Sequence, residues 1–246
     1  GTFQYRAVAA ATAELAGTVS PVRTLTVAEP VTWTDETVLV SHDVDGGPAN
    51  AYSQWPSISD DGRFVAYDSD ASDLVVDDPD NDKNDIFLWD RQTDTTVLVT
   101  RTMDGGGIDN DANAPQISGN GRYVAYSSNA HDIVDVENPL NRQAVYRWDR
   151  LTGETILVSH SPSGGIPEGG SGDMSISESG AHIAFTSNAH DLTADDFSGQ
   201  VGTETHVFRW TEPSGEVVDD TILVTKRPDG DPATYSSTDP YISDSG

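Results

Sequence analysis

The sequence predicts an all-β protein built from repeated small sheets. Two observations lead to this prediction. The 22 glycines and 13 prolines supply many turns, and one sequence pattern returns along the chain at a nearly fixed step. Composition also excludes several classes of protein. Cysteine is absent, which removes disulfide frameworks and thiol catalysis, and no apolar run approaches the roughly 18 residues of a membrane span.

The repeated pattern consists of an apolar strand, a turn that contains glycine and a second apolar strand. Its copies are residues 56–67, 115–126 and 174–185, and a fourth copy begins at 240–246. The first two steps are therefore 59 residues and the third is 66. A shared step at many separate positions marks a true internal repeat, because chance similarity would not keep the spacing.

Each repeat predicts four short strands. In the first repeat these are Pro56–Ser59, Arg63–Ser69, Asp85–Asp90 and Thr96–Thr100. The middle strands are apolar almost without interruption, which indicates that both of their faces are covered. A single four-stranded sheet cannot bury two apolar faces, but copies stacked around an axis can, and this arrangement is a β-propeller.

Both ends of the chain carry a predicted strand that lacks a blade of its own. Thr37–Ser41 has the pattern of a fourth strand ahead of the first complete repeat, and 240–246 opens a further repeat. We therefore expect a partial propeller, with three complete four-stranded blades plus an orphan strand at each end. Such a chain would be truncated from a larger ring of six to eight blades, and the remaining blades would be needed for ring closure.

The predicted domain organisation follows from these boundaries. The incomplete propeller spans 36–246, with repeats 56–114, 115–173 and 174–239 and the start of the next at 240–246. Gly1–Val8 and Val22–Val27 alternate like strands and resemble the last two strands of an immunoglobulin-like or fibronectin type III domain, so 1–29 is assigned to the end of such a domain and 30–35 to a linker. No signal-peptide pattern is present.

The turn motif resembles that of the TolB-like, PD40-type β-propellers, also called WD40-like, in which S-x-D-G-[RK] precedes an apolar strand. It stands here as Ser59–Arg63, with variants at Ser118–Arg122 and Ser177–Ala181, the last without its arginine. Ser69–Val75 and Asp85–Arg91 are similar to a longer subtype found in secreted bacterial proteins. The resemblance implies an extracellular, periplasmic or cell-surface binding module, but it fixes no ligand.

One loop is a candidate calcium site. Asp78, Asp80 and Asp82 alternate before the third strand of the first repeat, and Asp85 closes the set. Calcium takes six to eight oxygen ligands, which a short loop of this kind can supply. The loop is similar to the calcium loops of other extracellular propellers, although Lys83 stands where glycine usually makes the bend. The alternative is a solvated acidic loop; if calcium binds, its role is structural.

Polar residues that recur in register are interpreted as structural. A residue that every blade needs is expected to fix a turn through side-chain-to-backbone hydrogen bonds rather than to act in catalysis. The recurring aspartates are Asp73, Asp132, Asp191, Asp90 and Asp149. His131 and His190 occupy equivalent positions and are expected to be surface residues of loops.

The predicted function is a non-catalytic binding or scaffold module that binds a protein or polysaccharide through its faces. The 41 acidic and 13 basic residues give a net charge of −28, which argues against nucleic acid as a partner and against docking on anionic membranes. No G-x-S-x-G motif or other catalytic residue is identified, and calcium is the only cofactor considered. Two alternatives stay open: the propeller domain of an extracellular carbohydrate-active hydrolase or lyase, and a purely structural spacer.

Overall fold

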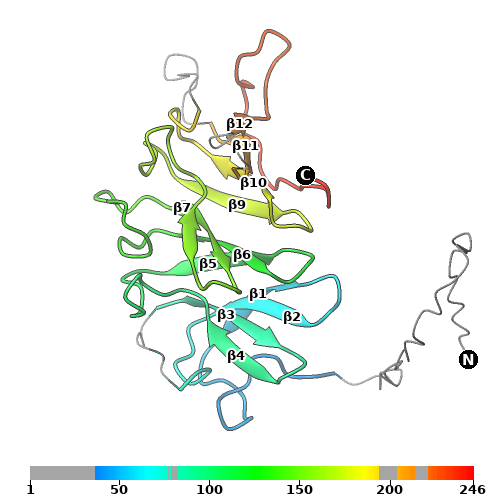
Figure 1. Ribbon diagram of the computed structural model, residues 1–246. Helices are drawn as coiled ribbons and strands as arrows, with labels where there is room; N and C mark the ends of the chain where they lie inside the picture. Colours follow the sequence, from blue (N-terminus) through cyan, green and yellow to red (C-terminus); the bar gives the residue numbers. More distant parts are fainter. Residues whose placement is uncertain (1–36, 77, 79–82, 194–203, 214–220) are drawn as a thin grey trace, which may run out of the picture. The chain divides into compact units, whose positions relative to one another are not determined.

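The computed structural model describes residues 37–76, 78, 83–193, 204–213 and 221–246. The chain divides into two units, Gly1–Val38 and Leu39–Gly246. The strands predicted in 1–29 and the linker at 30–35 lie outside the described residues. Within the described part, the regular secondary structure is all β (Figure 1), and it contains no helix able to cross a bilayer.

Three sheets make up the unit Leu39–Gly246, each with four antiparallel strands hydrogen-bonded in chain order. The first sheet contains β1 (Ser53–Ile58), β2 (Phe64–Ser69), β3 (Asp85–Asp90) and β4 (Thr95–Leu98). The second contains β5 (Ala112–Ile117), β6 (Tyr123–Ser128), β7 (Ala144–Asp149) and β8 (Thr155–Leu157). The third contains β9 (Ser171–Ile176), β10 (His182–Ser187), β11 (His206–Thr211) and β12 (Ile222–Leu223). The predicted four-stranded repeats are therefore confirmed.

The three sheets are arranged as blades that fan out from their first strands. Strand β5 lies between β1 and β9 and contacts both of them. The described fourth strands β4, β8 and β12 make no contact of this extent with a strand of another blade. The sheets follow one another as successive layers in Figure 1. This wedge-like arrangement confirms a partial propeller rather than one continuous sandwich.

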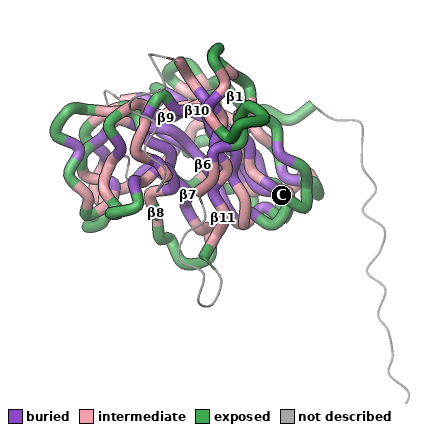
Figure 2. The backbone as a smooth tube through the Cα atoms, turned by 90° about the horizontal axis from the view of Figure 1, so that it is seen from above, coloured by how far each residue is buried: buried purple, intermediate pink, exposed green. Residues whose placement is uncertain are grey.

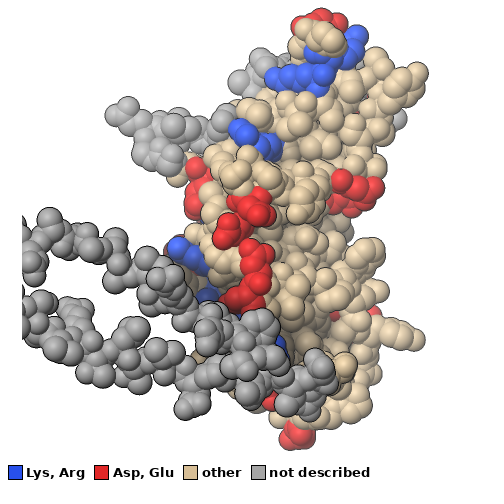
Figure 3. Space-filling model, turned by 90° about the vertical axis from the view of Figure 1, so that its right-hand side faces the viewer, with Lys and Arg blue, Asp and Glu red and all other residues tan. Residues whose placement is uncertain are grey.

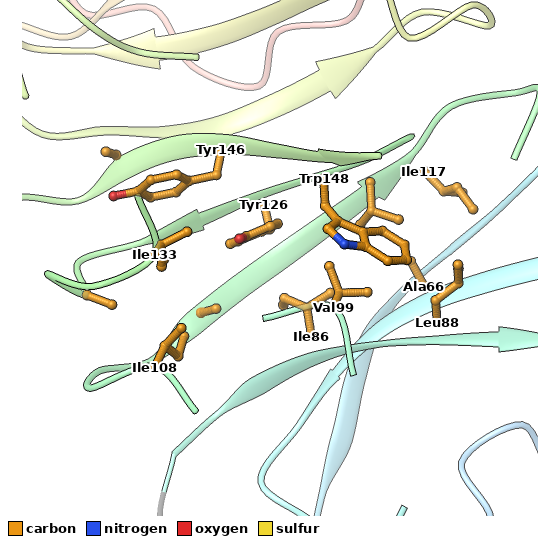
Figure 4. Packing of buried hydrophobic residues seen from close by; sticks show 14 of the residues in the cluster. Ala66, Ile86, Leu88, Val99, Ile108, Ile117, Tyr126, Ile133, Tyr146 and Trp148 are labelled. Carbon is orange, nitrogen blue, oxygen red and sulfur yellow. The ribbon is translucent and has the colours of Figure 1, made fainter. Parts of the chain in front are cut away.

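The middle strands of each blade are buried on both faces. All six residues of β2 and all six of β6 are buried, and β6 lies among other buried segments in Figure 2. Successive side chains of a strand point to opposite faces, so one face of the first blade packs Ala66 and Leu88 against Tyr126 and Trp148 of the second (Figure 4). Burying a large apolar side chain contributes roughly 1.5–3 kcal/mol, so contacts between blades supply much of the stability.

An aromatic pair recurs at the same place in every blade, where the second strand lies beside the third. Ring centroids are 5.7–5.9 Å apart and the rings are stacked in the pairs Tyr67–Phe87, Tyr126–Tyr146 and Phe185–Phe208. These cross-strand pairs stiffen each sheet from within.

The glycine of each turn motif allows one blade to approach the next closely. Gly121 has a φ of +68°, and a Cβ atom there would lie 2.5 Å from the ring of Phe64 in the preceding blade. Gly180 approaches Tyr123 in the same way, and Gly246 of the fourth copy approaches His182. Only a residue without a side chain satisfies both the left-handed backbone and this contact.

Replacing this glycine tests how the blades pack. Gly62→Ala and Gly121→Ala introduce the same strain, because φ is +67° and +68°, but a Cβ at Gly62 meets nothing within 4 Å. We expect Gly62→Ala to lower the free energy of unfolding by about 1–2 kcal/mol and Gly121→Ala by roughly 1–3 kcal/mol more, because the methyl group overpacks the contact with Phe64. Urea denaturation measures both variants. Equal losses would show that the close approach contributes nothing.

The two end segments differ from the prediction of orphan strands. Thr37–Ser41 forms no strand, since no described strand pairs with it, and Val38 and Leu39 are exposed. The segment at 240–246 also lacks a ladder, because a strand needs a partner to exchange backbone hydrogen bonds. It nevertheless docks on the third blade: Ile242 is buried, and its N–H donates to Ser175 Oγ (3.3 Å), as the Ile117 N–H donates to Ser57 Oγ (3.1 Å).

Ion pairs tie the second and third strands together in the first two blades. Arg63 donates two hydrogen bonds to the Asp90 carboxylate (2.7 and 2.8 Å), and Arg122 binds Asp149 in the same manner. These bonds hold the pKa values of both aspartates below their ordinary range. The third blade has Ala181 in place of the arginine, so no equivalent pair forms there.

Acidic side chains are dispersed over the surface. On the face in Figure 3, Asp and Glu form separate patches among larger uncharged areas, with Lys and Arg patches nearby. Dispersal limits the repulsion that a net charge of −28 creates, because screened charges interact weakly beyond about 8–10 Å.

Candidate functional site

A left-handed residue interrupts the first strand of every repeat. It falls at equivalent positions in all four copies: Trp55 (φ 50°), Ala114 (φ 53°), Asp173 (φ 32°) and Asp239 (φ 51°). In the three complete blades the strand pairing shifts there, which marks a β-bulge. A non-glycine residue in this region costs about 1–3 kcal/mol, and a bulge redirects its side chain. The fold accepts this cost four times.

The bulge residues line two adjoining cavities that share Trp55, Ala114 and Asp173. Their volumes are about 470 Å³ and about 260 Å³. We call both cavities together the inner groove. Its lining residues are Trp55, Asn113, Ala114, Gln116, Ser127, Gln143, Gly170, Ser171, Gly172, Asp173, Met174, Thr186, Ser187, Asn188, Thr205, Thr238, Asp239, Pro240 and Tyr241.

The inner groove combines aromatic rings, carboxylates and amides. Trp55 is 65% exposed and Tyr241 is 87% exposed, although side chains of this size are usually at least half buried. Asp173 and Asp239 supply the carboxylates, and Gln143 supplies an amide. Because the backbone positions are equivalent while the side chains differ, the groove presents different chemistry from each blade.

A buried carboxylate supports the floor of the groove. Asp68 of β2 is fully buried, and its Oδ2 accepts a hydrogen bond from the N–H of the bulge residue Ala114 (3.2 Å). Burial raises the pKa of Asp68 to about 6, although the Ala114 N–H and Asn84 oppose that rise. The equivalent residues are Ser127 and Thr186, so this ionisable group is peculiar to the first of the described blades.

Asp68 makes stability depend on pH. Its pKa is about 6 in the folded state and 3.8 in the unfolded chain, so the native protein binds the proton more tightly. That stabilisation is complete below pH 3.8 and is lost as pH rises through 6. Between pH 5 and pH 7 we expect Asp68 to lower the free energy of unfolding by about 1.4 kcal/mol.

Urea denaturation at pH 5 and pH 7 measures this effect, and Asp68→Asn is the control. The asparagine keeps the shape of the side chain but does not titrate, so the difference between the two proteins isolates the contribution of Asp68. An identical pH dependence in both would contradict the assignment.

The predicted calcium loop is only partly within the described residues. Asp80 and Asp82 lie outside them, whereas Asp78 and Asp85 are included. Asp85 is buried on β3, and its Oδ1 accepts a hydrogen bond from Thr100 Oγ1 (2.5 Å). In the described ranges, no group of three or more acidic or histidine side chains is arranged to hold a metal ion. Calcium binding by this loop stays a prediction.

A calorimetric titration with calcium chloride tests it. If the loop binds calcium, heat is released or absorbed at a defined stoichiometry and the melting temperature rises, because a ligand of the native state stabilises it. The double variant Asp80→Ala, Asp82→Ala should lose both effects. Magnesium chloride at the same ionic strength controls for screening, and an unchanged signal in the variant would refute the site.

The recurring aspartates are turn residues, as predicted. Asp73, Asp132 and Asp191 each accept a hydrogen bond from the backbone N–H of the residue 23 positions earlier in the chain. These donors are Asn50, Asp109 and Glu168, at 3.1, 3.2 and 2.9 Å. Asp90 and Asp149 cap the following turn through the N–H groups of Gln92 and Leu151. These bonds brace the loops of each blade.

A separate cavity of about 490 Å³ adjoins His131. The imidazole Nδ1 lies 2.7 Å from Asp109 Oδ2, and Nε2 contacts Asn141 Oδ1. Hydrogen bonding to Asp109 and Asn141 raises the pKa of His131. Its side chain is partly exposed, as expected of a loop residue. Because the polar groups bind one another, this cavity is a weaker candidate site than the inner groove.

The inner groove was not among the sites predicted from the sequence. Trp55, Ala114 and Asp239 each precede a proline, and Asp173 occupies the same repeat position before Met174. One position that changes from Trp to Ala to Asp directly ahead of the recurring pattern was the available signal. This signal was missed because the positive φ comes from the β-bulge. The sequence of a short apolar strand does not show where a bulge will form.

Comparisons with known proteins give structural similarities only. No family model matches the sequence, and no curated protein matches it. Several solved structures are similar. TolB from Acinetobacter baumannii is 16% identical with a TM-score of 0.40, covering 74% of this chain and 34% of that one.

Two oligogalacturonate lyase structures are also similar. The enzyme from Vibrio parahaemolyticus is 14% identical with a TM-score of 0.38, covering 69% of this chain and 42% of that one. A structure in complex with manganese is 13% identical with a TM-score of 0.42, covering 74% and 45%. The chain thus spans less than half the length of these three proteins.

Proposed function

We propose that this chain is a non-catalytic binding module whose ligand docks in the inner groove. The observation that carries the proposal is the four-fold recurrence of one strained backbone position with unlike side chains, Trp55, Ala114, Asp173 and Asp239. A purely structural spacer would gain nothing from holding an exposed tryptophan in a strained conformation.

The composition of the groove supports recognition. Binding sites are concave, with apolar and aromatic walls and a few convergent polar groups, and tryptophan is enriched among residues that dominate binding energy. Trp55 provides such an anchor, and Gln143 and Asp173 provide polar groups beside it. The ligand is a protein or a glycan outside the cytoplasm, in the medium, the periplasm or at the cell surface.

A second candidate function is carbohydrate cleavage, because Asp173 and Asp239 line the same small cavity. Two carboxylates on either side of a sugar can act as acid and base in glycoside hydrolysis. Binding is favoured, since both aspartates are exposed, whereas the carboxylic acid that donates a proton in such enzymes lies in an apolar pocket.

An array of immobilised peptides and oligosaccharides tests the proposal. Wild-type protein should retain a ligand class that Trp55→Ala binds roughly 30-fold more weakly, because a central tryptophan anchor contributes 2 kcal/mol or more. Tyr235→Ala is the matched control, since Tyr235 is 82% exposed and does not line the groove. If all ligands keep their affinity in Trp55→Ala, the groove is not the binding site.

A product assay with soluble polysaccharides distinguishes the second function. Binding without accumulation of new reducing ends or unsaturated products supports the module. Turnover that disappears in Asp173→Asn would assign catalysis to the groove instead.

A further inference from the structure

The smaller cavity of the inner groove has an unusual lining. Two exposed aromatic residues contribute: Trp55 comes from β1 and Tyr241 from the segment at 240–246. Two aspartates also contribute: Asp173 comes from β9, and Asp239 directly precedes the segment at 240–246. The volume of about 260 Å³ accommodates a side chain rather than an extended polymer. Its occupant therefore meets ring faces and carboxylates together.

The charge in this cavity has one sign. Among the described residues that line either cavity, there is no lysine, arginine or histidine. The Asp239 carboxylate accepts a hydrogen bond from Thr238 Oγ1 (3.1 Å), a neutral donor. Clefts lined by one sign of charge concentrate the field and attract the opposite ion, so the cavity favours a cation and disfavours anionic sugars.

The aromatic rings favour the same occupant. A guanidinium or ammonium group over the face of an indole is held by the ring quadrupole, and tryptophan is the best of the aromatic partners. The protein already uses this contact internally: the Arg150 guanidinium carbon lies 4.3 Å from the ring centroid of Phe64, and that of Arg147 lies 4.2 Å from the Tyr123 ring. A neutral sugar could stack on Trp55 but would make no use of the charge.

We propose that the smaller cavity binds an arginine or lysine side chain of a partner protein. The inference rests on the proposed function and names its ligand class. The adjoining larger cavity suits the backbone that carries such a side chain, because Asn113 and Gln143 supply amide donors and acceptors and the glycines Gly170 and Gly172 add no side chain to its wall. An extended basic segment would thus lie in the larger cavity with one side chain in the smaller.

Nuclear magnetic resonance of the full chain, labelled at its five tryptophans, tests the inference. The Trp55 indole N–H signal is assigned with Trp55→Phe. The probes are N-acetyl-Gly-Arg-Gly-amide, the same peptide with citrulline, which keeps the shape without the charge, and cellopentaose as a neutral glycan. We expect saturable shifts of the Trp55 signal with the arginine peptide and at least about tenfold weaker binding of the citrulline peptide, the ratio expected for a charge-assisted contact.

Variants identify the groups responsible. Asp173→Asn and Tyr241→Ala should each weaken the arginine peptide roughly 3- to 10-fold, and added salt should weaken it further. Asp229→Asn and Tyr235→Ala are matched controls, because both residues are exposed and lie outside the groove. Circular dichroism verifies that each variant is folded.

The possible outcomes separate the two claims. Equal binding of the arginine and citrulline peptides, or a Trp55 shift with cellopentaose alone, overturns the cationic ligand but leaves the groove as a binding site. The cationic ligand is also overturned, and the groove kept, if ligands from the array require Trp55 but the arginine peptide does not shift the Trp55 indole signal. If no probe shifts Trp55 and no array ligand depends on it, both claims fall.

Discussion

The fold depends on burying both faces of a sheet that is only four strands wide. Each blade presents apolar side chains on either side of its middle strands, and the neighbouring blade covers them. The turn glycines Gly121 and Gly180 set how closely the blades approach, since each lies against an aromatic ring of the preceding blade. The position of every other group follows from this packing, including the bulges that line the inner groove.

In the proposed function, structure and recognition use different positions of the same repeat. The aspartates that recur in register, such as Asp132 and Asp191, accept backbone hydrogen bonds and keep the loops in place. The bulge position has the opposite character, because its backbone is constant and its side chain varies. A residue such as Trp55 can therefore serve a ligand without altering how the blades pack.

The architecture could be predicted because repetition places the same physical demand at fixed intervals. Apolar runs such as Ile86–Trp89 predict strands covered on both faces, and these strands lie where expected. The orphan segments form no ladder, since a segment such as Thr37–Ser41 has the composition of a strand but no described partner for its backbone.

The candidate site was much less predictable. The spacing of the aspartates around Asp78 suits a metal ion and can be read locally in the sequence. The inner groove instead gathers residues more than 180 positions apart, from Trp55 to Tyr241. These residues lie close together because the first strands of neighbouring blades lie side by side and because the bulges redirect side chains. Neither property can be read from strand composition alone.

The four left-handed positions, three of which are β-bulges, also have a kinetic consequence. The hydrogen bond from Ala114 to Asp68 shows how the folded blades hold such a backbone in place before any ligand arrives. Because the folded blades already hold the strained backbone in place, a ligand does not have to order the main chain of the groove. Only side-chain rotamers are restricted on association. Encounter should then be limited by diffusion and charge rather than by a slow rearrangement of the protein.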